Sequence, residues 1–208
     1  MLHFETVEQD TITLLKKLMI LPQLKTFYLV GGTSLSLKYG HRISIDLDLF
    51  CNEKFDNNII IEILEKEFGK DLEYEGGFSN FGVFCFIKNI KVDLVYYPHP
   101  IIFPINHFDD IRMYASEDIA AMKIQAILGR GKKKDFWDMA ELLQHYSLKE
   151  IISFHQKKYP SQQLLISIPQ AISYFEDADE SEDPVSLKGQ TWESVKKNIQ
   201  QNVNYYLK

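Results

Sequence analysis

Two aspartates inside an otherwise apolar run are the residues of this chain best suited to chemistry. Asp46 and Asp48 stand two apart in ISIDLDLF, residues 43–50. In a strand, this spacing projects both side chains from one face. Two carboxylates that lie so close together repel each other unless a cation lies between them, so the pair indicates a metal site. The alternative is a solvated edge strand of alternating polarity, with Ser44, Asp46 and Asp48 outward.

A glycine turn precedes this run. The apolar FYLV, residues 27–30, ends in Gly31, Gly32, Thr33 and Ser34. Glycines let the backbone approach a ligand closely, which leaves amide N–H groups free for an anion. We expect these amides, with the Thr33 or Ser34 hydroxyl, to bind the β- and γ-phosphates of a nucleotide. Alone, the pair Gly31-Gly32 would indicate only a strand-to-helix turn, but its place ahead of the two aspartates favours the phosphate site.

A third carboxylate stands alone in a later apolar run. Asp93 lies in IKVDLVYY, residues 90–97. Three acids from adjacent strands can hold two Mg²⁺ ions, one on a triphosphate and one activating an attacking hydroxyl. An edge strand would account for the alternation around Asp46 and Asp48, but it leaves the glycine turn and Asp93 unexplained. The sequence therefore favours a metal-dependent phosphoryl or nucleotidyl transfer site.

Helices and short strands must position these groups. Hydrophobic spacing predicts helices over residues 5–21, 33–39, 57–68, 117–130, 135–146, 148–158 and 191–207. Apolar runs bounded by turn residues predict strands over 27–30, 43–50, 78–87 and 90–96. Pro98, Pro100 and Pro104 interrupt regular structure, so we expect a boundary near residue 108. An acidic loop, EDADESEDP, covers residues 176–184.

The helix expected over residues 117–130, with Ser116 as its N-cap, carries a candidate cationic stripe. Lys123 comes one turn after Ile119, and Arg130 lies two turns further along. Such a stripe suggests a face turned towards an anion. The alternative is that Ala120, Ile124, Ile127 and Leu128 form the buried face while Lys123 extends beside it. Periodicity alone does not decide between the two.

Composition limits the class of protein. The chain has 208 residues and a formal net charge of −6, which disfavours wholesale coating of nucleic acid. Its two cysteines, Cys51 and Cys85, lack zinc-type spacing. The start MLHFETVEQD has neither the basic region nor the apolar core of a signal peptide, and no run reaches about 18 apolar residues. We expect a cytoplasmic protein without a membrane partner.

The pattern of Gly31, Gly32, Asp46, Asp48 and Asp93 resembles the signature of the DNA polymerase β-type nucleotidyltransferases. More narrowly, GGTSLSLKYGHRISIDLDLF together with SEDIAAMKIQAILGRGKKKDFWD resembles the AbiEii/AbiGii toxin family of nucleotidyltransferases, over most of residues 27–140. The resemblance implies an α/β (α+β) fold. A mixed-sheet nucleotidyltransferase core would span residues 1–108, and a C-terminal helical region, residues 109–208, would complete the active cleft.

The resemblance also implies roles for individual residues. Mg²⁺ or Mn²⁺ would bind to Asp46, Asp48 and Asp93, and Lys123 would neutralise the triphosphate. Asp135, after the basic run Lys132–Lys134, matches the family's active-site motif, although a favourable charge at a helix N-terminus would also explain it. Asp138 is a weaker candidate. The expected nucleotide-binding residues are Gly31, Gly32, Thr33, Ser34, Arg42, Lys123 and Arg130. For Arg42, a structural salt bridge is an equal alternative.

The expected activity is transfer of a nucleoside monophosphate from an NTP to an acceptor hydroxyl of RNA, including tRNA, or of protein. By resemblance, the chain would be the toxin of a bacterial toxin–antitoxin or abortive-infection system and would have a cognate antitoxin. The alternative is a non-catalytic nucleotide-binding or partner-binding module that keeps the fold. Retention of all three aspartates and of Lys123 favours the enzyme.

Overall fold

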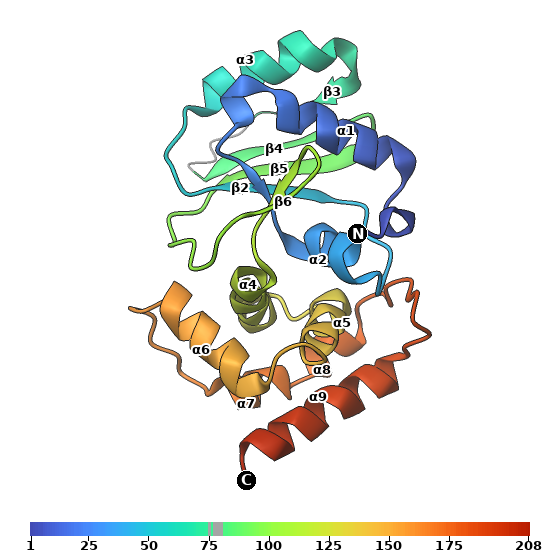
Figure 1. Ribbon diagram of the computed structural model, residues 1–208, viewed down its shortest axis with the longest axis vertical. Coiled ribbons are helices and arrows are strands. Elements are labelled where there is room, and N and C mark those ends of the chain that lie inside the picture. Colours follow the sequence, from blue (N-terminus) through green and yellow to red (C-terminus); the bar gives the residue numbers. More distant parts are fainter. Residues whose placement is uncertain (75, 77–80) are drawn as a thin grey trace.

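A mixed sheet with helices on both faces forms the upper half of the molecule (Figure 1). The structure is a computed structural model, and it describes residues 1–74, 76 and 81–208. In these residues the sheet has the strand order β3-β4-β5-β2-β1-β7-β6. The pairs β2–β5 and β1–β7 are parallel, and the other neighbours are antiparallel. The α/β fold with a mixed sheet is thus confirmed.

The strands are short, as expected where turns and helices interrupt them closely. They are β1 (Tyr28–Leu29), β2 (Leu47–Cys51), β3 (Leu72–Glu73), β4 (Gly82–Ile87), β5 (Ile90–Tyr96), β6 (Asn106–Phe108) and β7 (Ile111–Met113). The α-helices are α1 (Gln9–Ile20), α2 (Gly31–Tyr39), α3 (Asn57–Phe68), α4 (Ser116–Gly129), α5 (Lys133–Leu142), α6 (Leu148–Lys158), α7 (Ile168–Ile172), α8 (Glu176–Asp179) and α9 (Trp192–Tyr206). Short 3₁₀-helices cover Phe4–Thr6, Pro22–Leu24 and Gly69–Asp71.

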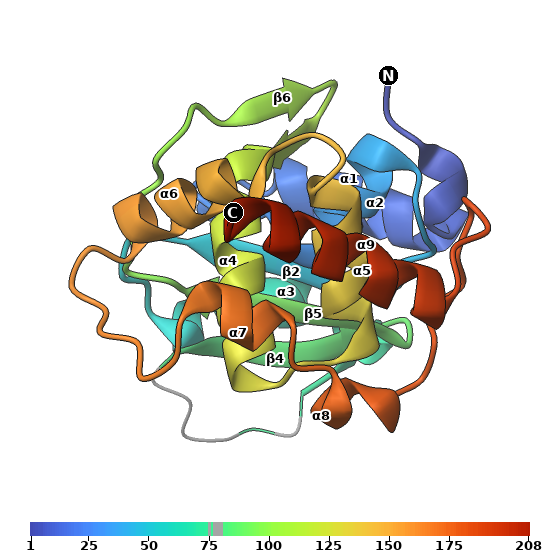
Figure 2. The same ribbon diagram turned by 90° about the horizontal axis from the view of Figure 1, so that it is seen from below.

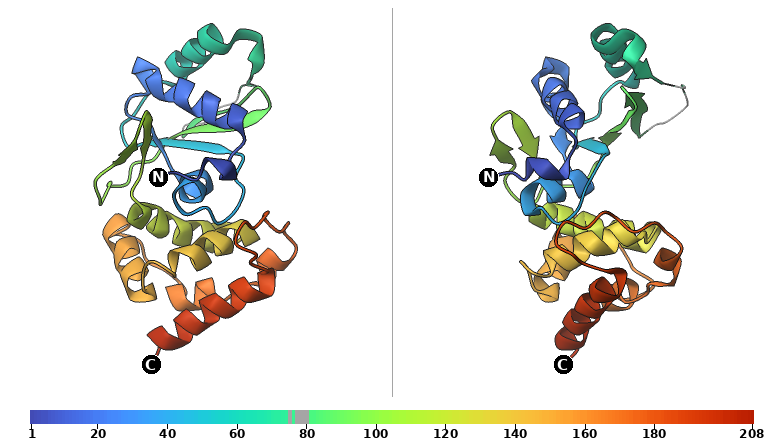
Figure 3. Two further views of the ribbon diagram at one scale, coloured as in Figure 1. Left: turned by 45° about the vertical axis from the view of Figure 1, so that its right-hand side comes forward. Right: turned by 90° about the vertical axis from the view of Figure 1, so that its right-hand side faces the viewer.

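One face of the sheet is covered by α1 and α3 (Figures 1 and 3). Alternate residues of the strands turn towards these helices and form one buried cluster, including Leu47 and Leu49 of β2, Leu94 of β5 and Cys85 of β4. Because side chains alternate along a strand, the residues between them, Asp48 and Asp93 included, must face the opposite side. The apolar pattern of ISIDLDLF therefore fixes which face is left for the aspartates.

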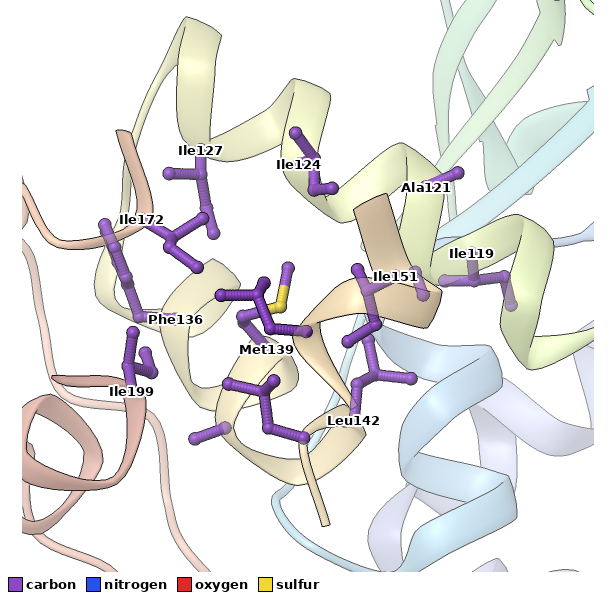
Figure 4. Close-up of a cluster of buried hydrophobic side chains, with 14 of the residues drawn as sticks. Ile119, Ala121, Ile124, Ile127, Phe136, Met139, Leu142, Ile151, Ile172 and Ile199 are labelled. Carbon is purple, nitrogen blue, oxygen red and sulfur yellow. The ribbon is translucent and has the colours of Figure 1, made fainter. Parts of the chain in front are cut away.

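The opposite face meets α2 and α4, and the remaining helices pack beneath (Figures 2 and 3). A second buried cluster joins α4, α5, α6 and α9 (Figure 4). Ile124, Phe136 and Ile199 are fully buried within it. Residues 106–113 form the β6–β7 hairpin, and β7 belongs to the sheet. A division of the chain near residue 115, rather than after residue 108, would keep this hairpin whole.

The strand expected over residues 43–50 is shorter than predicted. It begins at Leu47, and within residues 43–46 the alternation fails, since Ile45 is 60% exposed and Ser44 is buried. The backbone of Ile43 instead donates to the carbonyl of Val185, and Ser44 donates to the carbonyl of Thr6. These remote partners hold residues 43–46 outside the sheet.

Other expectations also differ in their bounds. The helices expected over 5–21 and 135–146 span Gln9–Ile20 and Lys133–Leu142. The helix expected over 33–39 begins two residues earlier, at Gly31. The strand expected over 78–87 is present from Gly82, and residues 78–80 lie outside the described residues. Within the described chain, each helix is too short or too polar to cross a lipid bilayer.

Candidate active site

Asp48 and Asp93 lie side by side on neighbouring strands. The parallel pairing of β2 with β5 places Asp48 opposite Asp93. One oxygen of Asp93 accepts a hydrogen bond from Lys91, whereas the other, Oδ1, is buried without a hydrogen-bond partner. Burial, and then the charge of Asp93, raise the pKa of Asp48 above its ordinary value. Two crowded carboxylates and an unsatisfied oxygen are a donor set that suits a hard divalent cation.

Asp46 stands apart from this pair. It precedes β2, and its Oδ2 lies 3.4 Å from the Lys134 Nζ of α5. Among the residues that the structure describes, no group of three or more His, Cys, Asp or Glu side chains is gathered closely enough to hold a metal ion. The pair Asp48–Asp93 is therefore preformed, whereas Asp46 would have to turn from Lys134 to join it. The three-aspartate metal site stays a prediction.

The glycine turn brings the N-terminus of α2 against Asp48. Gly31 has φ of +72°, and a Cβ atom there would lie 2.5 Å from Asp48 Oδ2. At Gly32, a Cβ would collide with the guanidinium of Arg42. The first amides of a helix have no intrahelical acceptor and attract anions. Both glycines are needed for the close approach of these charged side chains.

Thr33 holds the backbone that carries Asp46 in place. Its hydroxyl donates to the backbone carbonyl of Asp46 and also forms a 2.8 Å hydrogen bond with the Ser44 hydroxyl. Thr33 and Ser34 are both 1% exposed. The Thr33 hydroxyl therefore fixes the backbone just before β2, and phosphate binding by the amides of α2 stays a prediction.

Lys123 is buried between two aspartates of the following helix. Its Nζ lies 3.0 Å from Asp135 Oδ1 and 2.6 Å from Asp138 Oδ2. Asp135 also accepts two hydrogen bonds from Arg130, at 2.8 and 2.9 Å. Both alternatives for α4 apply, because Ala120 and Ile124 are in the core while Ile119, Lys123, Ala126 and Arg130 line a cavity.

Asp138 is the centre of this buried network. Besides Lys123, it accepts two hydrogen bonds from Arg42, at 2.7 and 2.9 Å, and lies 2.8 Å from His41 Nε2. Arg42 thus forms the structural salt bridge. Asp138 joins α5 to the segment after α2, so it links the helical region to the sheet region across about a hundred residues of sequence.

The network keeps its members charged. Although burial opposes ionisation, the charges of Lys123 and Arg130 lower the pKa of Asp135 to about 2. Burial is likewise outweighed at Asp138, where Arg42 and Lys123 hold the pKa well below its ordinary value. The same pairs raise the pKa of Lys123 despite its burial. Three cations, Arg42, Lys123 and Arg130, thus face two anions, which leaves one positive charge in excess.

Two cavities meet at these residues. A polar cavity of about 340 Å³ is lined by the three aspartates Asp46, Asp48 and Asp93 and by the cations Lys123, Arg130 and Lys134, among others. An apolar cavity of about 320 Å³ is lined by Phe50, Tyr97, Met122 and Ala126, among others. Asp48, Lys123 and Arg130 line both. Carboxylates from the sheet and cations from the helices therefore face one another across one cleft.

Sequence reasoning missed several members of this cleft. Phe50, Tyr97 and Met122 gave no signal beyond ordinary hydrophobicity. Asp138 was a weaker candidate than Asp135, yet it has more buried partners. The contact of residues 41–43 with the segment 185–187 joins parts of the chain more than 140 positions apart, and no local pattern could reveal it.

Comparisons with known proteins show which family and which structures this chain is similar to. The family described as "Nucleotidyl transferase AbiEii toxin, Type IV TA system" matches residues 13–202. The protein aq_aa25 of Aquifex aeolicus (strain VF5) is 33% identical over 201 residues, covering 93% of this chain and 94% of that protein.

Two solved structures have the same fold. MenT4, the nucleotidyltransferase toxin Rv2826c of Mycobacterium tuberculosis H37Rv, has a TM-score of 0.61 at 15% identity, covering 93% of this chain and 82% of that one. JHP933 of Helicobacter pylori has a TM-score of 0.55 at 17% identity, covering 96% and 92%.

Proposed function

This chain belongs to the AbiEii family of nucleotidyltransferase toxins, as its motifs predicted, and we propose that it transfers a nucleoside monophosphate from an NTP to an acceptor hydroxyl. In this reaction the acceptor oxygen bonds to the α-phosphorus, the bond to the β-phosphate oxygen breaks, and pyrophosphate leaves. The observation that carries the proposal is the pairing of Asp48 with Asp93, with its unsatisfied oxygen, at the edge of a cavity lined by cations.

Asp48 and Asp93, joined by Asp46, would hold Mg²⁺ or Mn²⁺. A divalent cation bound there would neutralise triphosphate charge and lower the pKa of the acceptor hydroxyl. Asp93 lies on the side of Asp48 away from β1, next to β4. In that position its carboxylate would face the incoming acceptor and assist removal of the hydroxyl proton.

The two cavities suit the two halves of an NTP. The triphosphate would lie in the polar cavity, against the first amides of α2 and the cations Lys123 and Arg130. A lysine ammonium has three hydrogens. Asp135 and Asp138 engage Lys123, and its remaining hydrogen would reach a phosphate oxygen. The base would enter the apolar cavity between Phe50, Tyr97 and Met122.

Asp135 and Asp138 act on the reaction through their partners. Their carboxylates hold Lys123, Arg42 and Arg130 in place before substrate arrives. Cations fixed in advance need not reorganise as charge moves onto pyrophosphate, which is the condition for strong electrostatic catalysis. We assign both aspartates a positioning role.

For the biological role, we propose a toxin that modifies RNA, including tRNA, or protein in the cytoplasm, under the control of a cognate antitoxin. Family membership and the toxin MenT4, which shares the fold, support this role. A non-catalytic nucleotide-binding module is the weaker alternative, because the family is one of nucleotidyltransferases and the chain has the three candidate aspartates as well as Lys123.

The proposal is tested by label transfer. The protein is incubated with each α-phosphate-radiolabelled NTP, Mg²⁺ or Mn²⁺, and either total RNA or cell lysate, and the labelled macromolecule is separated by electrophoresis. We expect label in one class of macromolecule, together with release of pyrophosphate. Binding of NTP without label transfer to any acceptor would contradict the proposed reaction.

A further inference from the structure

Two exposed phenylalanines stand on the sheet face that carries the aspartates. Phe84 and Phe86 of β4 are each 45% exposed. Antiparallel pairing places Phe84 opposite Asp93 and Phe86 opposite Lys91 of β5. Since directly paired residues lie on one face, Phe84, Asp93 and Asp48 form a row across three strands.

This exposure is unusual for the sheet. The neighbouring residues of β4, Val83, Cys85 and Ile87, are buried against the helices on the other face. Only the short β3 lies outside β4 in the described sheet, and Figure 2 shows β4 towards that edge. Large apolar side chains that occur singly on a surface are common, but two on one face beside charged side chains indicate a contact surface.

We infer that Phe84 and Phe86 form a stacking platform for unpaired bases of a single-stranded nucleic-acid acceptor, whose terminal hydroxyl reaches Asp93. The inference rests on the proposed function and narrows its acceptor. Aromatic side chains on an open sheet face bind bases by stacking, a contact that every base can make. Paired residues of antiparallel strands are about 5 Å apart, so a base on Phe84 places its sugar within reach of Asp93.

Cations that pair with aspartates of the cleft, but keep part of their side chains exposed for a phosphate backbone, surround the platform. Lys91 lies beside Phe86, with its side chain 42% exposed. Across the polar cavity lie Arg130 and Lys134, with side chains 51% and 38% exposed. On the other side of Phe86, at the edge of the sheet, Glu73 of β3 is paired with it, and the negative charge of Glu73 would repel the phosphate backbone of the acceptor. A strand would therefore run over β4 and β5 towards the cations.

The spacing of the two rings fits splayed bases. Residues two apart on a strand are separated by about 7 Å, and bases stacked in a strand are separated by about 3.4 Å. The two rings would therefore hold bases that no longer stack on each other, or one base between them. A duplex end, whose bases stay paired and stacked, fits this platform poorly.

The test compares strands with and without bases. A 5′-fluorescein 12-nucleotide single-stranded RNA and the same strand with six abasic 3′-terminal positions are titrated with the wild-type protein and with Phe84→Ala/Phe86→Ala, and anisotropy gives each Kd. Stacking contributes about five- to hundred-fold in affinity per base. We expect the intact RNA to bind the wild type at least fivefold more tightly than the abasic strand, and the double variant to bind both strands equally.

Two further variants keep the result unambiguous. Phe84→Leu/Phe86→Leu retains apolar volume without the rings and should behave as the alanine variant does. Ile59→Ala removes another exposed apolar side chain, on α3, and should leave both affinities unchanged. The platform would be overturned if the alanine variant lost the same affinity for intact as for abasic RNA, or lost none. It would also be overturned if the leucine variant still bound intact RNA more tightly than abasic RNA, or if the wild type bound no RNA.

The same wild-type preparation is tested for label transfer from NTP, which separates the two proposals. If transfer occurs while the phenylalanine variants keep the base dependence, the platform is wrong and the proposed reaction stands. If transfer fails with every acceptor, the reaction is wrong, whatever the RNA affinities show. Label on protein alone, with no binding of RNA, would assign the phenylalanines to a protein acceptor and overturn the inference.

Discussion

Replacement of Asp138 by asparagine should destabilise the fold more than replacement of any other acidic residue of the cleft. The Asp138 side chain is fully buried and contacts Arg42, Lys123 and His41, which are themselves 5% exposed or less. Removing one charge of such a network leaves cations without water or a full partner, which costs about 3–5 kcal/mol. In a chain of 208 residues, each kcal/mol lowers the melting temperature by about 2–4 °C, so we expect a loss of roughly 6–20 °C.

Two matched variants give the comparison. In Asp135→Asn, the stranded Arg130 is half exposed and recovers water, while Lys123 keeps Asp138, so we expect a loss of about 1–3 kcal/mol. In Asp71→Asn, a surface pair with Lys88 is removed, and the loss should be below about 1 kcal/mol. Melting is followed by circular dichroism, and urea unfolding gives the free energies.

The pH dependence checks that charge is responsible. A carboxylate whose pKa is lowered by folding stabilises the folded state at every pH above its pKa in the unfolded chain, here 3.8. This stabilisation is lost as the pH falls from 3.8 towards the lower pKa of the folded state. The difference between wild type and Asp138→Asn should therefore be full at pH 6 and shrink as pH falls through 3.8. A smaller loss for Asp138→Asn than for Asp135→Asn at pH 6, or a difference independent of pH, would refute the reasoning.

Three further predictions concern the cleft. Asp48→Asn should raise the melting temperature in metal-free buffer at pH 7. Burial and Asp93 raise the pKa of Asp48, so its charge destabilises the folded state above that pKa. The gain in melting temperature should shrink towards pH 3.8, and a lower melting temperature at pH 7 would contradict the prediction. Gly31→Ala should abolish label transfer by displacing Asp48, whereas Gly189→Ala, with φ of +67° and open space, should cost only about 1–2 kcal/mol of stability and keep activity. Ala126→Phe should fill the apolar cavity and remove the thermal shift given by metal–NTP, and an unchanged shift would place the base elsewhere.

Much of the sheet side of the site could be predicted from sequence. Alternation around Leu47, Leu49 and Leu94 determines which face of β2 and β5 is buried, and it leaves Asp48 and Asp93 on the other face. The spacing within α4 gave a core face and a cationic stripe as alternatives, and the structure has both. These are local patterns with a fixed period, so one sequence is enough to read them.

The parts that could not be predicted depend on contacts between remote segments. Residues 43–46 alternate like a strand, yet Thr6 and Val185 hold their backbone away from the sheet. Asp138 reads as one more charge on a helix, and only the fold brings Arg42 and Lys123 to it. The exposure of Phe84 and Phe86 could not be predicted either, because all of residues 83–87 are apolar and no alternation tells which face of β4 stays open.

The most direct test of the central claim is label transfer from an α-phosphate-labelled NTP by wild type, Asp93→Asn and Asp71→Asn. Removing one preorganised charged group from the reacting centre should lower the rate by about 100-fold or more. We predict this loss for Asp93→Asn with its fold intact, and wild-type transfer for Asp71→Asn, which lies at the β3 end of the sheet. Undiminished transfer by Asp93→Asn would contradict the account.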